Sequence, residues 1–113
     1  MSIDDKAKTL ENEADQHFVK MIRLLAEAVD IKCLTHGKLR YMDTKLLKKS
    51  IQLLMLYRGI DSMTELAKEL KVSTGTITKM MHDKDNRTVN KASIDTLIEY
   101  MYETADEYER GIL

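Results

Sequence analysis

The chain of 113 residues contains no proline and only four glycines, so it has few of the residues that interrupt regular structure. It also lacks any run in which Val, Ile and Thr alternate with polar residues, the usual signature of a half-buried strand. Short strands have room only in two segments, Cys33 to Met42 and Asp83 to Asn90, neither long enough for more than a hairpin. The pattern therefore predicts an all-α protein.

Tryptophan is absent, and Cys33 is the only cysteine, so no disulfide can form within the chain. No apolar run approaches the roughly 20 residues that a membrane-spanning helix needs. The N-terminus reads MSIDDKAK and lacks the basic and then apolar layout of a secretory signal. These absences predict a cytoplasmic protein with no membrane partner.

The chain also lacks the motifs of common enzymes and cofactor sites, since no P-loop, GxSxG or HExxH sequence occurs. Cys33 and His36 stand at a spacing that metal ligands use, but no second pair accompanies them, because His17 and His82 are distant in sequence. We therefore expect no enzyme activity, no bound metal and no cofactor.

The net charge is only -1, but the charges are unevenly distributed along the chain. Residues 31–91 carry thirteen basic and six acidic side chains, whereas residues 92–113 carry one basic and six acidic. Residues 1–30 are also acidic, with seven acidic and four basic side chains. Although solvated charges also cluster by chance, a basic middle between acidic ends is typical of a domain that contacts phosphates.

Within this basic middle, residues 62–82 read SMTELAKELKVSTGTITKMMH, which indicates two short amphipathic helices separated by a turn. Ser62 and Glu65 match a capping box and predict the start of the first helix. After a turn at residues 71–73, Ser73 is placed to cap the second helix. The apolar face of that second helix consists of Ile77, Met80 and Met81.

The outward side of the second helix is small and polar, unlike the Glu and Lys pairs common on a purely structural helix. Such side chains suit a major groove, where hydroxyl groups and lysine bond to base edges and a glycine permits close approach. The expected base-contacting residues are Thr74, Gly75, Thr76, Thr78, Lys79 and His82. The expected phosphate-contacting residues are Ser62, Ser73, Lys84, Asn86, Arg87 and Lys91. An ordinary helical bundle with a capped second helix is the alternative.

The residues LAKELKVSTGTITK resemble the Cro and lambda-repressor family of helix-turn-helix proteins, whose members often read like LAKELGVSxGTISK. The likeness covers roughly residues 44–101, from a helix over Thr44–Arg58 to a helix capped by Ser93. It implies a lambda-repressor-like helical bundle that binds double-stranded DNA. The chain departs from the family at Lys71, where glycine is favoured, and in the long segment from Asp83 to Ala92.

Four units follow from these patterns. Residues 1–30 form an amphipathic helix from about Ile3 to Val29, residues 31–43 a connector, residues 44–101 the DNA-binding unit, and residues 102–113 an extension of its last helix. Both end helices carry apolar residues at spacings of three and four, as in a coiled-coil seam.

The apolar seams of the two end helices predict a homodimer. The expected dimerisation residues are Leu10, Phe18, Met21 and Leu25 in the first helix and Met101, Ala105, Tyr108 and Ile112 in the last. Packing of these helices on the DNA-binding unit of the same chain, or on each other, is the alternative.

Together, the patterns predict a sequence-specific regulator of transcription that binds double-stranded DNA as a dimer, with residues 74–82 in the major groove. The resemblance implies a repressor of phage, plasmid or mobile-element type. The alternative function is a protein-binding adaptor or inhibitor, which keeps the helix-turn-helix scaffold and uses its acidic terminal helices to occupy a partner protein.

Overall fold

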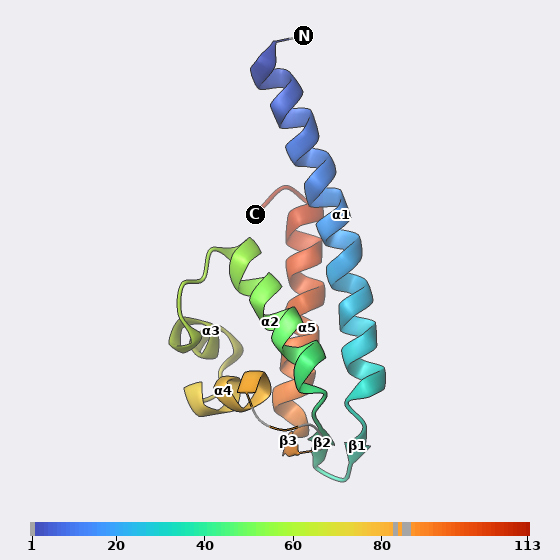
Figure 1. The fold of residues 1–113 in the computed structure, drawn as a ribbon, viewed down its shortest axis with the longest axis vertical. Helices are drawn as coiled ribbons and strands as arrows, with labels where there is room; N and C mark the ends of the chain where they lie inside the picture. Colours follow the sequence, from blue (N-terminus) through green and yellow to red (C-terminus); the bar gives the residue numbers. More distant parts are fainter. Residues whose placement is uncertain (1, 83, 85–86) are drawn as a thin grey trace.

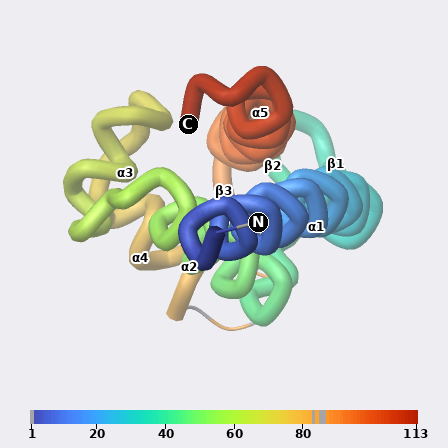
Figure 2. The backbone as a smooth tube through the Cα atoms, turned by 90° about the horizontal axis from the view of Figure 1, so that it is seen from above, coloured from blue at the N-terminus to red at the C-terminus, as the bar shows by residue number. Residues whose placement is uncertain are grey.

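In a computed structural model, which describes residues 2–82, 84 and 87–113, the described part of the chain forms five helices and three short strands. The helices are α1 (Ile3–Lys32), α2 (Thr44–Arg58), α3 (Met63–Leu70), α4 (Thr74–His82) and α5 (Lys91–Glu109). The strands are β1 (Thr35–His36), β2 (Leu39–Tyr41) and β3 (Thr88–Asn90). Figure 1 shows α5 beside the lower half of α1, with the three strands at the lower end. In Figure 2, α2 and α5 lie between α1 on one side and α3 and α4 on the other.

The described chain is mostly helical, as predicted, but it is not purely all-α, because β1, β2 and β3 form an antiparallel sheet. The two segments in which the sequence left room for strands pair with each other, and Arg40 of β2 faces Val89 of β3. A main-chain hydrogen bond from Met42 N to Arg87 O extends this pairing. Strands of two or three residues are too short to show a period, so only the fold reveals them. β1 and β2 lie in the segment 31–43, where the sequence indicates a connector.

The boundaries of α2, α3 and α4 follow local signals and confirm the predicted ones. The side chain of Asp43 caps α2, and Gly59 ends it in the left-handed conformation at φ 68°. At the start of α3, Ser62 Oγ accepts a hydrogen bond from Glu65 N at 3.1 Å. The Glu65 carboxylate accepts from Asp61 N at 3.4 Å, so the reciprocal bond of the capping box falls one residue earlier than expected.

The two long helices differ from their predicted limits. α1 continues beyond Val29 to Lys32. The sequence predicts Ser93 as the cap of α5, but that prediction is wrong, because the helix begins at Lys91 and buries Ser93 in its first turn. Asn90, the last residue of β3, stands at the cap position without a side-chain capping bond. The end of the sheet, rather than a hydroxyl cap, therefore fixes where α5 begins.

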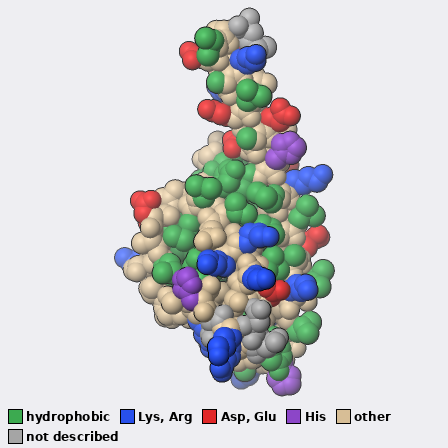
Figure 3. Space-filling model, in the orientation of Figure 1, with side chains coloured by type: hydrophobic (Ala, Val, Ile, Leu, Met, Phe, Trp, Pro, Cys, Tyr) green, Lys and Arg blue, Asp and Glu red, His purple; other side chains and the backbone are tan. Residues whose placement is uncertain are grey.

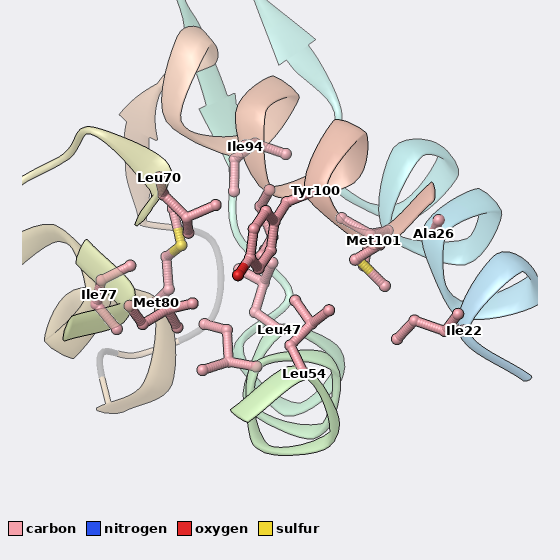
Figure 4. Packing of buried hydrophobic residues seen from close by; sticks show 14 of the residues in the cluster. Ile22, Ala26, Leu47, Leu54, Leu70, Ile77, Met80, Ile94, Tyr100 and Met101 are labelled. Atoms are coloured by element: carbon pink, nitrogen blue, oxygen red, sulfur yellow. The ribbon is translucent and has the colours of Figure 1, made fainter. Parts of the chain in front are cut away.

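α5 lies at the centre of a single hydrophobic core that all five described helices share. On one side, Met101 faces Ile22 and Ala26 of α1, as Figure 4 shows. On its other side, Ile94 and Tyr100 lie toward α2, α3 and α4. Because α5 is buried on both sides, the position of α4 is fixed relative to α1.

Arg40 joins the sheet to both long helices. Its side chain is almost fully buried, and its guanidinium donates to Cys33 O at 2.8 Å and to Asp30 O and Oδ1 at 2.8 and 2.9 Å. It also donates to Asp95 Oδ1 in α5 at 2.7 Å. Burial opposes the charge, but the bonds to Asp30 and Asp95 outweigh it and raise the pKa of Arg40 above its ordinary value. The planar fork of arginine can serve all these acceptors at once.

Replacing Arg40 with lysine keeps the charge but removes the fork, so buried acceptors lose their donors. We expect Arg40→Lys to lower the free energy of unfolding by about 2–3 kcal/mol, measured by urea denaturation. Arg23→Lys is the matched control, because Arg23 also pairs with two carboxylates, Asp106 and Glu109, but on the surface. Its effect is expected to stay within about 1 kcal/mol. Equal losses in the two variants would contradict the part played by Arg40.

Candidate nucleic-acid interface

α3 and α4 are joined by a turn of three residues, 71–73, that is closed by main-chain bonds. Lys71 adopts the left-handed conformation, with φ 57° and ψ 41°. The Val72 N–H donates to Ala67 O at 3.0 Å, and the Lys71 N–H donates to Lys68 O at 3.2 Å. These bonds satisfy carbonyl groups at the end of α3 and direct the chain into α4. Lys71 therefore carries the strain that glycine would avoid at this position.

Ser73 caps α4, as the sequence predicts, and it also engages Thr76. Ser73 Oγ accepts from Thr76 N at 3.1 Å and lies 2.9 Å from Thr76 Oγ1. Thr76 is half-buried at the edge of α4 rather than on its outer side. The Thr76 hydroxyl therefore already interacts with the capping serine and is less available to a ligand.

The inner side of α4 is held by Ile77 and Met80, both fully buried against α2 and α3. The opposite side carries an exposed polar stripe, which we call the outer face of α4. It consists of Thr74, Gly75, Thr78 and His82, with the half-buried Lys79 beside it. The structure thus brings five of the six expected base-contacting residues to one surface and places Thr76 at its border.

Gly75 has no structural reason to be glycine. A Cβ atom added there would meet only Ser73 Oγ, at 3.8 Å, which is an ordinary van der Waals contact. Glycine within a helix costs roughly 0.5–1 kcal/mol relative to alanine. No described neighbour of Gly75 requires the side chain to be absent, so the glycine leaves open space on the outer face of α4.

The expected phosphate-contacting residues are spread around α4. Ser62 and Ser73 are exposed at the N-termini of α3 and α4, and their hydroxyls accept from main-chain N–H groups of their own helices. Lys84 and Arg87 are exposed beyond the C-terminus of α4. Asn86 lies outside the described residues.

Lys91, a further expected phosphate contact, already has a partner within the chain. It is half-buried, and its ammonium group donates to Asp95 Oδ2. That bond, together with the bond from Arg40, lowers the pKa of Asp95 despite partial burial. Lys91 is therefore less available to a ligand than an exposed lysine.

A group of lysines on α2 enlarges the basic surface beyond the expected residues. Lys45, Lys48 and Lys49 line a shallow groove between α1 and α2, together with Lys32 from the end of α1. Figure 3 shows Lys and Arg side chains gathered on the lower half of the face where α2 and α4 lie. Three lysines on one helix more often form a solvated surface with no ligand. The fold places a fourth lysine, Lys32 of α1, beside them, which the sequence alone does not indicate.

The expected dimerisation residues fall into three sets. Phe18, Met101 and Ala105 are buried inside the chain, where α1 packs on α5, and are closed to a second copy. Tyr108 and Leu25 are half-buried, and the Tyr108 hydroxyl donates to Tyr57 O. The exposed residues of the set are Leu10, Met21 and Ile112. Packing of the last helix on the first, the alternative that the sequence left open, thus accounts for the buried set.

Comparison of the chain with known protein families, with curated proteins and with solved structures finds no match in any of the three. Across residues 2–82, 84 and 87–113, no helix combines the length and apolar composition that crossing a bilayer requires. The interpretation of the outer face of α4 therefore depends on its own chemistry.

Lys71 is strained because a residue with a side chain adopts the left-handed conformation there, and replacing it with glycine removes this strain. We expect Lys71→Gly to raise the free energy of unfolding by about 1 kcal/mol, measured by urea denaturation. Gly59→Ala is the converse control, because Gly59 ends α2 in the same conformation and its replacement should destabilise by about 1 kcal/mol. A Lys71→Gly variant less stable than the parent would show that the turn depends on the lysine itself.

Proposed function

We propose that this protein is a sequence-specific regulator of transcription that binds double-stranded DNA with α4 in the major groove. In this proposal α3 and α4 form a helix-turn-helix of the Cro and lambda-repressor type, the family that the residues LAKELKVSTGTITK resemble. The observation that carries the proposal is the outer face of α4, which is polar, small and centred on a glycine that no described contact requires.

The dimensions of α4 suit this function. An α-helix with its side chains is roughly 10–12 Å across, and the major groove is roughly 12 Å wide, so α4 fits within it. The buried Ile77 and Met80 hold the helix from behind, so its outer face projects from a rigid support. A rigid support lowers the entropy cost of docking a recognition helix.

The hydrogen bonds within α4 indicate what each side chain offers to a base. Thr78 Oγ1 donates to Thr74 O at 3.1 Å, so its proton is used within the helix. Thr78 is left with acceptor lone pairs and a methyl group, which fit an amino group of adenine or cytosine, or the thymine methyl. Lys79 can donate only, and it fits the guanine O6 and N7 acceptors. Thr76, held by Ser73, contributes less than the sequence suggests.

Phosphate contacts in this proposal come from two groups of basic residues. Lys84 and Arg87 lie beyond the C-terminus of α4, and the α2 lysines line the groove between α1 and α2. Neutralising phosphates releases counterions, so binding of this kind weakens steeply with salt. The resemblance favours repression, in phage, plasmid or mobile-element control, and two copies on a two-fold pair of half-sites.

A second candidate function is a protein-binding adaptor that uses the acidic terminal helices. The observation that favours it is the exposed N-terminal part of α1, where residues 2–14 contact no other element of the described chain closely enough to be buried. An adaptor of this kind has no need of the glycine on α4. It should show no measurable affinity for duplex DNA at about 50 mM salt.

Gly75→Ala separates fold from function at the outer face. We expect its free energy of unfolding to stay the same or rise by about 0.5–1 kcal/mol, because alanine favours the helix. Its affinity for duplexes selected from a random pool should fall by at least about 10-fold, because a methyl group then stands between α4 and the bases. Fluorescence anisotropy at fixed salt measures the affinity. Unchanged binding by a well-folded variant would remove α4 from the interface.

Thr78→Ala extends that test to single base positions, with Thr9→Ala as its matched control. Thr9 is also an exposed helical threonine, and its Oγ1 donates to Asp5 O at 2.9 Å, four residues back, as Thr78 does to Thr74. The Thr78 variant should change the preferred base at one position of the selected sequences. The Thr9 variant should select the same sequences as the parent.

Lys48→Gln and Lys49→Gln test the phosphate contacts of α2. Each variant should weaken binding to all duplexes alike and reduce the slope of log affinity against log salt by about 1. Lys8→Gln, on the projecting part of α1, is the control and should leave the slope unchanged. A variant that changes base preference rather than the slope would contradict the phosphate role, and a parent that binds no duplex would favour the adaptor.

A further inference from the structure

The N-terminal half of α1 has no packing partner within the described chain. Residues 2–14 are all exposed, and Figure 1 shows this part of α1 projecting beyond the end of α5. Isolated helices of about 12–15 residues are marginally stable in water. A helix of this kind gains its stability when its apolar side is covered.

α1 carries two apolar stripes, and only one of them packs within the chain. The buried stripe faces α5 and α2 and includes Phe18, Ile22, Ala26 and Val29. The other, which we call the outer stripe, runs along the whole helix about a third of a turn away. It consists of Ile3, Ala7, Leu10, Ala14, His17, Met21, Leu24, Ala28 and Ile31. Every residue of the outer stripe is exposed except Ala28, which is half-buried.

The spacing of the outer stripe is that of a coiled-coil seam. Its residues follow one another at intervals of four and three without interruption from Ile3 to Ile31. A single amphipathic surface helix drifts from this spacing, because 3.6 residues make one turn, whereas a strict heptad repeat keeps its seam toward a supercoiled partner. Over the body of the protein, Met21, Leu24 and Ala28 line a shallow apolar depression on α1. The stripe thus offers a continuous contact along the helix.

We infer that the outer stripe binds the outer stripe of a second copy of this chain in a parallel, two-stranded coiled coil. In the heptad frame, Ala7, Ala14, Met21 and Ala28 occupy the a positions and Ile3, Leu10, His17, Leu24 and Ile31 the d positions. Alanine at most a positions lets the two helices approach closely. His17 is the only polar residue in the seam, and a single polar layer fixes the alignment of two helices.

The flanking charges fit the parallel orientation. In a parallel pair, a g residue faces the e residue five positions later in the other chain. Lys6 then faces Glu11 of the second copy, and Glu27 faces Lys32, so both charged pairs are attractive. In an antiparallel pair g residues face g residues, and the sign of the interaction depends on the register. With Leu10 opposite Ala28, Glu13 faces Glu27 and the charges repel, whereas with Leu10 opposite Met21, Glu13 faces Lys20 and the charges attract. The orientation is therefore decided by crosslinking.

Sedimentation equilibrium of the full chain tests the association, and no DNA is needed, so the result is independent of the proposed function. The parent should sediment as a dimer at about 100 μM. Leu10→Asp should raise the dissociation constant by at least about 100-fold, because a charge replaces a seam leucine in both copies. Leu10 is 59% exposed in the single chain, so this variant should keep the core intact.

Leu56→Asp is the matched control for Leu10→Asp. Leu56 is a similarly exposed leucine, at 72%, but it lies on α2 away from the outer stripe. This variant should dimerise as the parent does. A parent that is monomeric at about 100 μM, or equal dissociation constants for the Leu10→Asp and parent chains, would overturn the inference.

Crosslinking tests the orientation. A cysteine at position 10 meets its own counterpart in a parallel dimer but lies opposite residue 21 or residue 28 in an antiparallel one, so Leu10→Cys should form a disulfide-linked dimer on mild oxidation. The native Cys33 is buried and does not compete. Lys6→Glu and Glu11→Lys should each weaken the dimer by about 3- to 10-fold, and the double variant should restore it. A dimer that neither crosslinks nor shows this restoration would overturn the parallel arrangement.

Discussion

The burial of α5 on two opposite sides is the constraint on which the other elements depend. Met101 and Ala105 close the contact with α1, while Ile94 and Leu97 close the contact with the helices that carry α4. Tyr100 lies between them, with the Arg58 guanidinium 4.2 Å from the centre of its ring. Burial raises the pKa of Tyr100 to about 12, so the ring stays neutral over the physiological range. A break at α5 would therefore leave α1 joined to the proposed DNA-binding unit only through its direct packing on α2.

α4 shows how such a core leaves a surface free for function. Its inner side is used by Ile77 and Met80, its start is held by Ser73, and its approach is set by the strained Lys71. These contacts satisfy the helix without using its outer face. When the contacts that stabilise a helix lie on one side, substitutions on the other side cost little stability. Such a surface suits the recognition of a ligand.

The two stripes of α1 divide structure from association in the same way. The buried stripe belongs to the core and is fixed by α5, whereas the outer stripe has no partner among the residues that the structure describes. Its strict heptad spacing and flanking charges make a second copy the occupant that the chemistry fits best. A two-fold dimer would also present two copies of α4, which matches the proposed reading of paired half-sites.

The sequence by itself determined the limits of α2, α3 and α4, because capping groups such as Asp43, Ser62 and Ser73 act within three or four residues of the chain. It also predicted which residues share the outer face of α4, because helical spacing depends on local sequence alone. Only the tertiary structure decided the rest. The sheet, the true start of α5 and the burial of Arg40 all join segments far apart in sequence, and no local period records such pairings. For the same reason, the apolar residues of α1 divided into buried and outer stripes only when α5 covered one of them.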